Sequence, residues 1–283
     1  MIDLHTHSTA SDGQYAPAAL VRKAQEKGIS VLALTDHDTA DGLAEAAAEA
    51  ERAGVVFVPG IELNISFPTG EFHLLGLGLR TVSPSLAKII AALQAERNER
   101  NEAVAERLRA AGIAVSLADV QREFPGKVLG RPHFAAWLER HKVVRTRQAA
   151  FDKYLGSGRP CYVGRAGADF DDAVAAVYES GGLPVIAHPL SLYLSWGKLE
   201  SALADFTERG LAGLEAWHPC ARVGECEHLE RIARSLGLFV TAGSDFHGEE
   251  VRRDRRPGHT SGGRKIDGRF WFEELRPALE RRQ

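Results

Sequence analysis

Histidine and carboxylate side chains recur in this chain at the ends of short apolar segments. His5 and His7 stand two positions apart in the extended opening stretch MIDLHTHSTASDG, so their imidazoles project from the same face. Asp12 follows closely enough to reach the same pocket. Because neutral imidazole nitrogens bind zinc, manganese and iron, the stretch predicts ligands for a divalent metal. The alternative is a surface strand that carries two histidines by chance.

The same residue types follow five further apolar segments. They supply six more candidate ligands: His37, Glu62, His73, His188, Asp245 and His247. A single histidine after a strand is usually a hydrogen-bonded core residue, so none of these positions is informative alone. Nine candidate ligands at six segment ends are more than chance places there, and together they predict a metal site.

Short apolar segments alternate with helical patterns through most of the chain. The expected strands cover 29–35, 55–62, 182–188, 211–217 and 238–243, and the expected helices cover 17–27, 40–53, 170–180, 198–209 and 225–236. This alternation predicts a parallel sheet covered by helices. The carboxyl ends of parallel strands meet at one rim, where α/β sheets and barrels carry their chemistry. The candidate ligands should therefore converge.

The alternation breaks after the third strand. The stretch ISFPTGEFHLLGLGL predicts a hairpin around Pro68 to Gly70 and a strand that brings His73 close to Glu62. Residues 80–157 have a mainly helical pattern without a clear strand. We therefore expect a metal-binding core formed by 1–79 and 158–283, and a helical insertion, 80–157, that covers the active site. The segment 270–279 resembles a closing helix.

Composition and charge narrow the class of protein. The chain is 44% hydrophobic and 26% charged, as is usual for a soluble globular protein, and its opening lacks a signal segment, so a cytoplasmic location is expected. Residues 80–160 contain 15 Lys and Arg against 8 Asp and Glu, a local charge of +7 in a chain of net charge −3. A basic segment beside a metal site favours an anionic substrate, and the alternative is a solvated helical face.

Five motifs, HTHSTASDG, LTDHDT, PGIELN, AHP and SDFH, resemble in order and spacing the signature of the polymerase and histidinol phosphatase (PHP) family of metallo-phosphoesterases. The resemblance implies an α/β fold, a distorted (β/α)7 barrel known as the PHP barrel, with a mainly helical insertion. It also implies three divalent metals at the carboxyl ends of the strands. Manganese is the first expectation, with iron or zinc as alternatives.

By position, the resemblance implies three sets of ligands. The first metal would be held by His5, His7, Glu62 and Asp245, the second by Glu62, His73 and His188, and the third by Asp12, His37 and His247. Two metals bridged by Glu62 would hold a catalytic hydroxide in line with phosphorus, and the third would bind a phosphate oxygen. Asp36 is expected to orient His37.

The insertion resembles the branch of the family that removes the 3′-phosphate of nucleoside 3′,5′-bisphosphates, which is related to enzymes that trim short RNA from its 5′ end. The residues that carry this closer resemblance, and that are expected to contact the substrate, are Arg97, Arg100, Asn101, Arg131 and His133. Of these, Arg97, Asn101 and Arg131 would bind the phosphate that is not cleaved. A planar guanidinium suits phosphate because it gives two parallel hydrogen bonds. The alternative for the helix arginines is a solvated face paired with neighbouring glutamates.

Two further features are basic. His218 lies at a strand end beside Trp217. It would donate a proton to the leaving hydroxyl or bind phosphate, and the alternative is a purely structural role. The run from Arg252 to Arg256 is expected to be a solvated loop that could touch a longer nucleic acid.

The leading prediction is a metal-dependent phosphatase that converts nucleoside 3′,5′-bisphosphates to 5′-nucleotides and phosphate, with 5′–3′ exonuclease activity on short RNA as an extension. Its partners would be nucleotides or short RNA, and no membrane or protein partner is implied. A second reading is a histidinol phosphatase, which the basic insertion disfavours because that substrate is a cationic amine ester. A third is a non-catalytic, metal-stabilised nucleic-acid-binding module. The sequence leaves open the metal, the base preference, the general acid and the oligomeric state.

Overall fold

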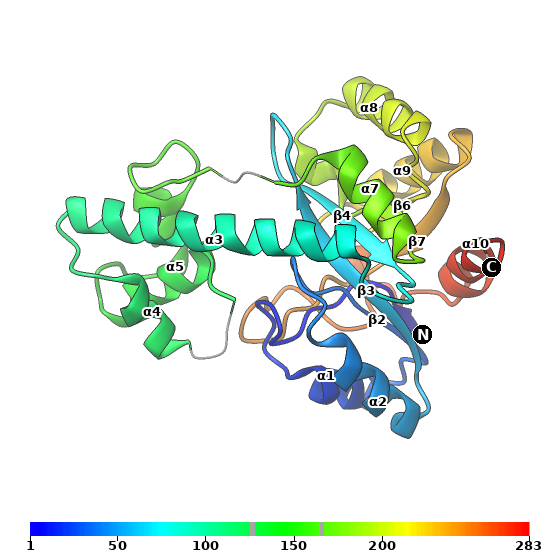
Figure 1. Cartoon of the computed structure of the whole chain (residues 1–283), viewed down its shortest axis with the longest axis horizontal. Coiled ribbons are helices and arrows are strands. Elements are labelled where there is room, and N and C mark those ends of the chain that lie inside the picture. The colour runs from blue at the N-terminus through cyan, green and yellow to red at the C-terminus, as the bar shows by residue number, and fades with distance from the viewer. Residues whose placement is uncertain (125–127, 165–166, 283) are drawn as a thin grey trace. The chain divides into compact units, whose positions relative to one another are not determined.

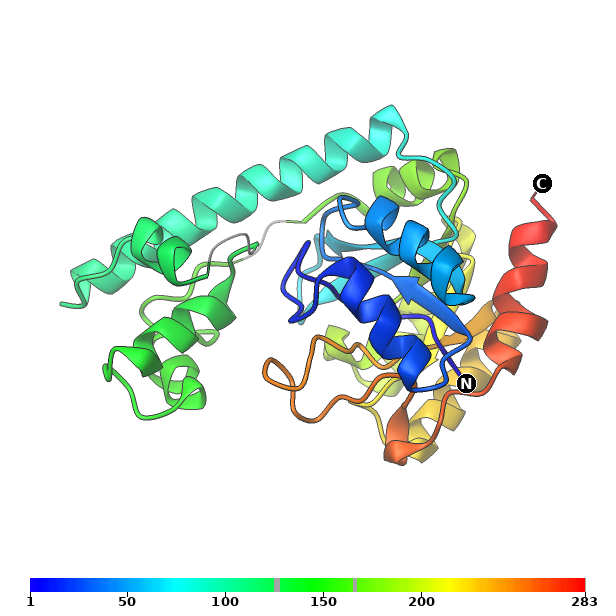
Figure 2. The same cartoon turned by 90° about the horizontal axis from the view of Figure 1, so that it is seen from below.

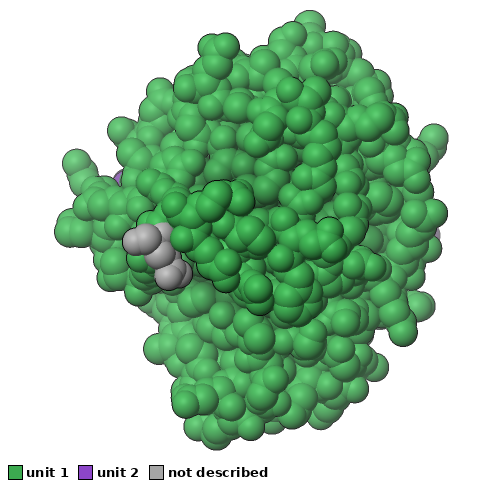
Figure 3. Space-filling model, turned by 90° about the vertical axis from the view of Figure 1, so that its right-hand side faces the viewer, with its two compact units in different colours: residues 1–90, 167–283 green, residues 91–166 purple. Residues whose placement is uncertain are grey.

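A computed structural model describes residues 1–124, 128–164 and 167–282. The chain divides into two compact units, Met1–Ile90 with Gly167–Gln283 and Ala91–Ala166 (Figure 1). We call these the larger unit and the smaller unit. Figure 3 shows one face of the larger unit in space-filling form. The expected insertion, 80–157, overlaps the smaller unit in sequence, and its covering of the active site stays a prediction.

The larger unit is built on a seven-stranded sheet whose spatial order follows the chain. Its strands are β1 (Ile2–Asp3), β2 (Val31–Leu34), β3 (Val56–Ile65), β4 (Phe72–Leu77), β5 (Leu183–Ile186), β6 (Gly213–Trp217) and β7 (Phe239–Ala242). Thr6 forms a parallel bridge with Phe246, and the His7 N–H donates to the Phe246 carbonyl at 3.0 Å. These contacts bring the two edges of the sheet together, so the expected distorted barrel is confirmed.

Strand β4 is the exception to parallel pairing. It runs antiparallel to both β3 and β5, whereas the other neighbouring strands are parallel. Its first residues therefore lie at the rim where the parallel strands end. Glu62 is opposite Leu75, and His73 precedes Leu75 by two residues, so Glu62 and His73 point to the same face. The expected hairpin thus delivers His73 to the rim.

Helices lie outside the strands of the larger unit (Figures 1 and 2). They are α1 (Pro17–Glu26), α2 (Leu43–Ala53), α7 (Phe170–Glu179), α8 (Trp196–Glu208) and α9 (Val223–Ser235), with short helical turns η2 (Pro189–Leu192) and η3 (Ser261–Gly263). The closing segment is π-helix η4 (Phe270–Leu275) followed by α10 (Arg276–Glu280). Strands β2, β4, β5, β6 and β7 are buried at every position, which explains why they read as continuous apolar runs.

The smaller unit is helical. Helix α3 (Pro84–Ala110) begins in the larger unit and ends in the smaller one, and it is followed by α4 (Leu117–Glu123), α5 (Arg131–Arg140), α6 (Arg147–Ala150) and π-helix η1 (Phe151–Leu155). Its own apolar core includes Val104, Leu108 and Phe134. Within the described residues, we find no helix that combines the length and apolarity needed to cross a membrane.

One local expectation was wrong. Strand β1 ends at Asp3, before the two histidines that were expected on it. His5 and His7 nevertheless stay aligned because the His5 carbonyl accepts from the Asp245 N–H at 2.9 Å. Arg131 and His133, two of the predicted substrate contacts, lie at the start of helix α5. Pro132 stands between them and fits the first turn of the helix, because its missing N–H costs nothing there.

Candidate metal centre

Glu62 is the centre of the site. It lies on β3, is fully buried, and is surrounded by five imidazoles. Its Oε2 lies 3.2 Å from His5 Nε2, 3.2 Å from His7 Nε2 and 3.0 Å from His37 Nδ1. Its Oε1 lies 2.9 Å from His73 Nδ1 and 3.0 Å from His188 Nε2. One carboxylate thus joins ligands from four strands or strand ends, as a bridging ligand must.

Asp245 provides the second carboxylate, just after β7. Its Oδ1 lies 3.3 Å from His7 Nε2, 3.3 Å from His247 Nδ1 and 3.7 Å from His5 Nε2. The residue has a φ of 52°, a left-handed conformation that aspartate tolerates better than most residues. This backbone turns the carboxylate back towards His5 and His7, which follow β1.

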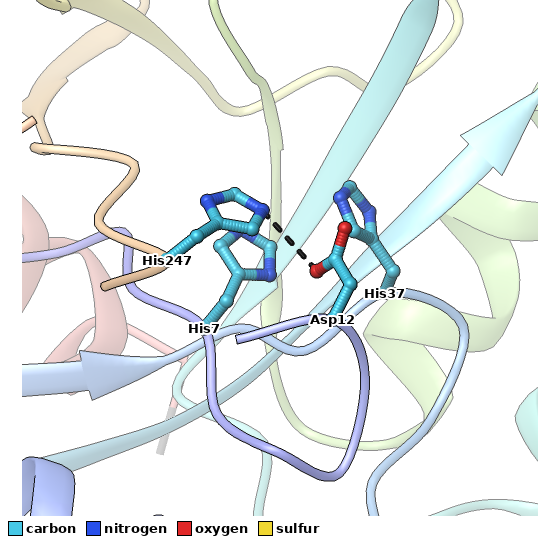
Figure 4. A group of neighbouring side chains, drawn as sticks. All are labelled: His7, Asp12, His37 and His247. Carbon is cyan, nitrogen blue, oxygen red and sulfur yellow. Dashed lines mark ion pairs between the residues drawn. The ribbon is translucent and has the colours of Figure 1, made fainter. Parts of the chain in front are cut away.

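Asp12 provides the third carboxylate, on the loop after β1. It lies in one group with His7, His37 and His247, whose candidate ligand atoms are all within 4.8 Å of one another (Figure 4). The Asp12 Oδ1 is 3.2 Å from His247 Nε2, and the His7 and His247 rings stack with centroids 3.9 Å apart. The loop, β2 and the β7 end therefore meet at this point.

The nine predicted ligands converge, and we call them the rim cluster: His5, His7, Asp12, His37, Glu62, His73, His188, Asp245 and His247. They form four overlapping groups able to hold a metal ion. Imidazole nitrogens face each other in two pairs, with His5 Nε2 3.1 Å from His7 Nε2 and His73 Nδ1 3.4 Å from His188 Nε2. A divalent cation matches such a donor set, because it binds neutral imidazole lone pairs and carboxylate oxygens together.

The neighbours of each side chain in the rim cluster also shift its pKa. Burial would raise the pKa of the Glu62 carboxyl, but the charges of His37 and His5 hold it well below its ordinary value. Burial would lower the pKa of His7, but its bonds to Asp245 and Glu62 raise it to about 10. Metal binding would displace protons from these ligands, because a metal binds the deprotonated carboxylate and the neutral imidazole.

Glu215 was missed as a site residue. It is buried on β6, and its Oε1 lies 3.0 Å from His5 Nδ1. Its Oε2 accepts the His188 N–H at 2.8 Å. An acceptor on Nδ1 fixes the His5 tautomer and leaves Nε2 as the ligand atom. The sequence did contain a signal for this residue, because Glu215 is the acidic residue within the otherwise uncharged strand GLEAW.

Asp36 does something other than expected. Its carboxylate accepts from the Ser8 N–H at 2.8 Å, the Ser8 hydroxyl at 2.6 Å and the Ser11 hydroxyl at 2.5 Å. These bonds hold the loop that presents Asp12. The expectation that Asp36 orients His37 was wrong, because within the described residues the Asp36 carboxylate is bonded to these serines, and His37 Nδ1 contacts Glu62 at 3.0 Å.

His218 lies beside Asp245, at the edge of the rim cluster. Its Nε2 is 3.3 Å from Asp245 Oδ2, and its Nδ1 is 2.8 Å from the Cys220 sulfur. Burial lowers the pKa of His218 despite the attraction of Asp245. A buried imidazole of lowered pKa can bind a substrate oxygen or pass a proton, so both predicted roles stay predictions.

The five predicted phosphate contacts all lie in the smaller unit. Asn101 is buried and donates to the Leu129 carbonyl at 2.9 Å. The Arg131 guanidinium stacks 5.1 Å from the Tyr162 ring centroid, and His133 Nδ1 accepts the Gly130 N–H at 3.1 Å. Arg97 and Arg100 are half-buried on α3. The predicted contacts of these five residues with substrate stay predictions.

Known proteins resemble this chain along nearly its whole length. The PHP domain profile matches residues 3–157. A 3′,5′-nucleoside bisphosphate phosphatase of Chromobacterium violaceum is 36% identical over 98% of this chain and 99% of its own length. The 5′-3′ exoribonuclease Rnm of Escherichia coli is 35% identical over 87% of this chain and 84% of its own length. A structure from Bifidobacterium adolescentis, provisionally assigned as a metal-dependent phosphoesterase, is 30% identical with a TM-score of 0.80, covering 96% of this chain and 94% of that one.

Proposed function

The chain belongs to the PHP domain family, and on that premise we propose that it is a metal-dependent phosphatase that removes the 3′-phosphate of nucleoside 3′,5′-bisphosphates. The observation that carries this proposal is the buried Glu62 carboxylate, contacted on both oxygens by imidazoles from separate strands or strand ends. A similar protein over nearly the whole chain bears the name of this activity.

Three divalent metals, manganese before iron or zinc, would occupy the rim cluster. The first would be held by His5, His7, Glu62 and Asp245, the second by Glu62, His73 and His188, and the third by Asp12, His37 and His247. Bound metals would supply an activated water and neutralise charge on the phosphate. The rim cluster supports this because its oxygen and nitrogen donors suit all three elements.

Protein groups would position the substrate around these metals. His218 reaches Asp245 and would bind a phosphate oxygen or give a proton to the leaving 3′-hydroxyl. The basic smaller unit would bind the phosphate that is not cleaved through Arg97, Asn101 and Arg131. The local charge of +7 in residues 80–160 supports an anionic substrate over a cationic one.

A cytoplasmic location remains a prediction.

Substrate comparison tests the proposal. Purified protein with manganese is expected to release phosphate from adenosine 3′,5′-bisphosphate, leaving 5′-AMP. His7→Ala should reduce this rate by at least about a hundredfold, because it removes a cluster ligand. His228→Ala is the matched control, because His228 lies on α9 outside the rim cluster. Faster turnover of histidinol phosphate, or formation of the 3′-nucleotide, would contradict the substrate assignment.

A second candidate is 5′–3′ exonuclease activity on short RNA. It is favoured by the 35% identity to the Escherichia coli exoribonuclease. A 5′-phosphorylated pentanucleotide with a label at its 3′ end should then be shortened one nucleotide at a time from the 5′ end. Release of label before shortening would indicate the opposite direction and contradict this candidate.

A further inference from the structure

Asp245 faces two different surroundings. Its Oδ1 faces the rim cluster, whereas its Oδ2 faces a set of donors on the other side. Those donors are His218 Nε2 and Arg252 Nη1, each 3.3 Å away, and Arg255 Nε at 4.0 Å. Two guanidinium groups therefore approach the metal centre from the loop after β7. Both belong to the larger unit, as the rim cluster does.

Arg255 is an unusual member of its loop. Its neighbours Arg253 and Arg256 are exposed as expected, but Arg255 is only 4% exposed. Its Nη1 donates to Asp254 at 2.6 Å, while its Nε makes no hydrogen bond to any described residue. The expectation of a solvated loop was therefore wrong at this position. A buried N–H without an acceptor is costly, so it indicates a position prepared for an acceptor that arrives with a ligand.

The loop that carries Arg252 and Arg255 is fixed at both ends by one side chain. Asp3 on β1 accepts from the Ser244 N–H at 2.9 Å, the Ser244 hydroxyl at 2.6 Å and the Gly258 N–H at 2.7 Å. Ser244 precedes Asp245, and Gly258 closes the loop. A guanidinium held on a fixed loop loses little conformational freedom when it binds an anion.

We propose that Arg252 and Arg255 form an anion-binding pair on the barrel that takes non-bridging oxygens of the phosphoryl group presented to the rim cluster. This inference rests on the proposed function and adds the residues that hold the cleaved phosphate. The pair fits a phosphate dianion because guanidinium groups offer N–H donors in a planar fork. A phosphate oxygen would supply the acceptor that Arg255 Nε lacks.

Inorganic phosphate is the probe that isolates this pair. Its binding to the manganese-loaded protein can be measured by calorimetry, and its competitive inhibition of turnover gives a second value. Arg255→Gln and Arg252→Gln should each weaken phosphate binding by at least about tenfold, as expected for the loss of a charge-assisted hydrogen bond. Arg253→Gln is the matched control, since it removes the same charge from an exposed position. Its phosphate affinity should stay within about twofold of the wild type.

These measurements distinguish failure of the anion-binding pair from failure of the proposed function. Unchanged phosphate affinity in folded Arg255→Gln and Arg252→Gln would overturn the pair and leave Arg255 a purely structural residue. If Arg255→Gln does not fold, Arg252→Gln decides alone, because the Arg252 side chain is 41% exposed and its replacement disturbs little packing. A wild-type protein that binds phosphate but does not hydrolyse adenosine 3′,5′-bisphosphate would contradict the proposed function. It would not contradict the proposal that Arg252 and Arg255 bind an anion.

Discussion

Two charged networks in the larger unit are balanced in different ways. The rim cluster gathers six imidazoles and three carboxylates, and imidazole nitrogens face each other at 3.1 Å and 3.4 Å in two histidine pairs. The second network, which we call the Glu230 network, joins Glu230, Arg234, Arg269, Glu274 and Trp217. In it, Glu230 accepts from Arg269 through two bonds of 2.8 Å and from Trp217 Nε1 at 2.6 Å.

The two networks differ in how their charges are neutralised, and this difference indicates a different role for each. In the Glu230 network each carboxylate has a guanidinium partner, with Arg234 donating to Glu274 at 2.9 Å, so the charges compensate each other. The rim cluster instead surrounds its carboxylates mainly with imidazoles, whose ring nitrogens can bind either a proton or a metal ion. We expect a site of that kind to be completed by metal cations. We therefore expect the first network to govern catalysis and metal response, and the second to govern stability alone.

The largest effect should come from Glu62→Gln. This change removes the charge that joins five imidazoles and should lower the turnover of adenosine 3′,5′-bisphosphate by about a thousandfold or more, since several kcal/mol of charge stabilisation are lost. Steady-state phosphate release measures the effect. Glu230→Gln is the control and should retain nearly full activity. Comparable losses in both variants would remove the distinction between the networks.

Metal removal should come next. Chelation should abolish turnover and lower the melting temperature by about 5 °C or more, because a metal at about a hundred times its Kd contributes about 2.7 kcal/mol. Differential scanning calorimetry before chelation, after it, and after manganese is restored measures this shift. The Glu230→Gln variant should show the same metal-dependent shift as the wild type. A melting temperature that does not change when metal is removed would argue against metal binding by the rim cluster.

A smaller effect is expected for Glu215→Gln. Among the described residues, Glu215 hydrogen-bonds to the cluster through His5 and His188, so its loss should weaken metal binding by about 10- to 100-fold without abolishing it. Titration of the metal-free protein with manganese, followed by recovery of activity, measures the apparent affinity. Saturating manganese should restore most of the turnover, which distinguishes a residue that positions ligands from a ligand. Failure of excess metal to rescue the variant would oppose this role.

The smallest effect should be that of Glu230→Gln on stability. The bonds from Arg269 lower the pKa of Glu230 from its ordinary 4.5 to about 2. A carboxyl with a lowered pKa stabilises the fold above the unfolded value and loses that contribution as pH falls towards the folded value. The variant should therefore lose about 1–2 kcal/mol at pH 7, and the difference should shrink as pH falls from 5 towards 2. Urea unfolding at several pH values measures it, and a difference that grows on acidification would be the wrong sign.

Much of the site could be predicted from residue types and spacing. Histidines and acids at the ends of apolar segments indicate a shared rim, because the carboxyl ends of parallel strands converge whatever the loops do. Even His73, on the antiparallel strand β4, was placed correctly, because a hairpin returns its second strand to the end of the first.

Tertiary structure decided the partners of those ligands. His5 and Glu215 are separated by 210 residues, and their contact depends on how far the barrel twists and closes. The same holds for Asp36, which binds Ser8 and Ser11 rather than His37, and for Arg255, which is buried among exposed arginines. Local sequence specifies which side chains reach the rim, because periodicity and strand ends are local properties. Which donor meets which acceptor there is set by the packing of distant segments, and that is a property of the whole fold.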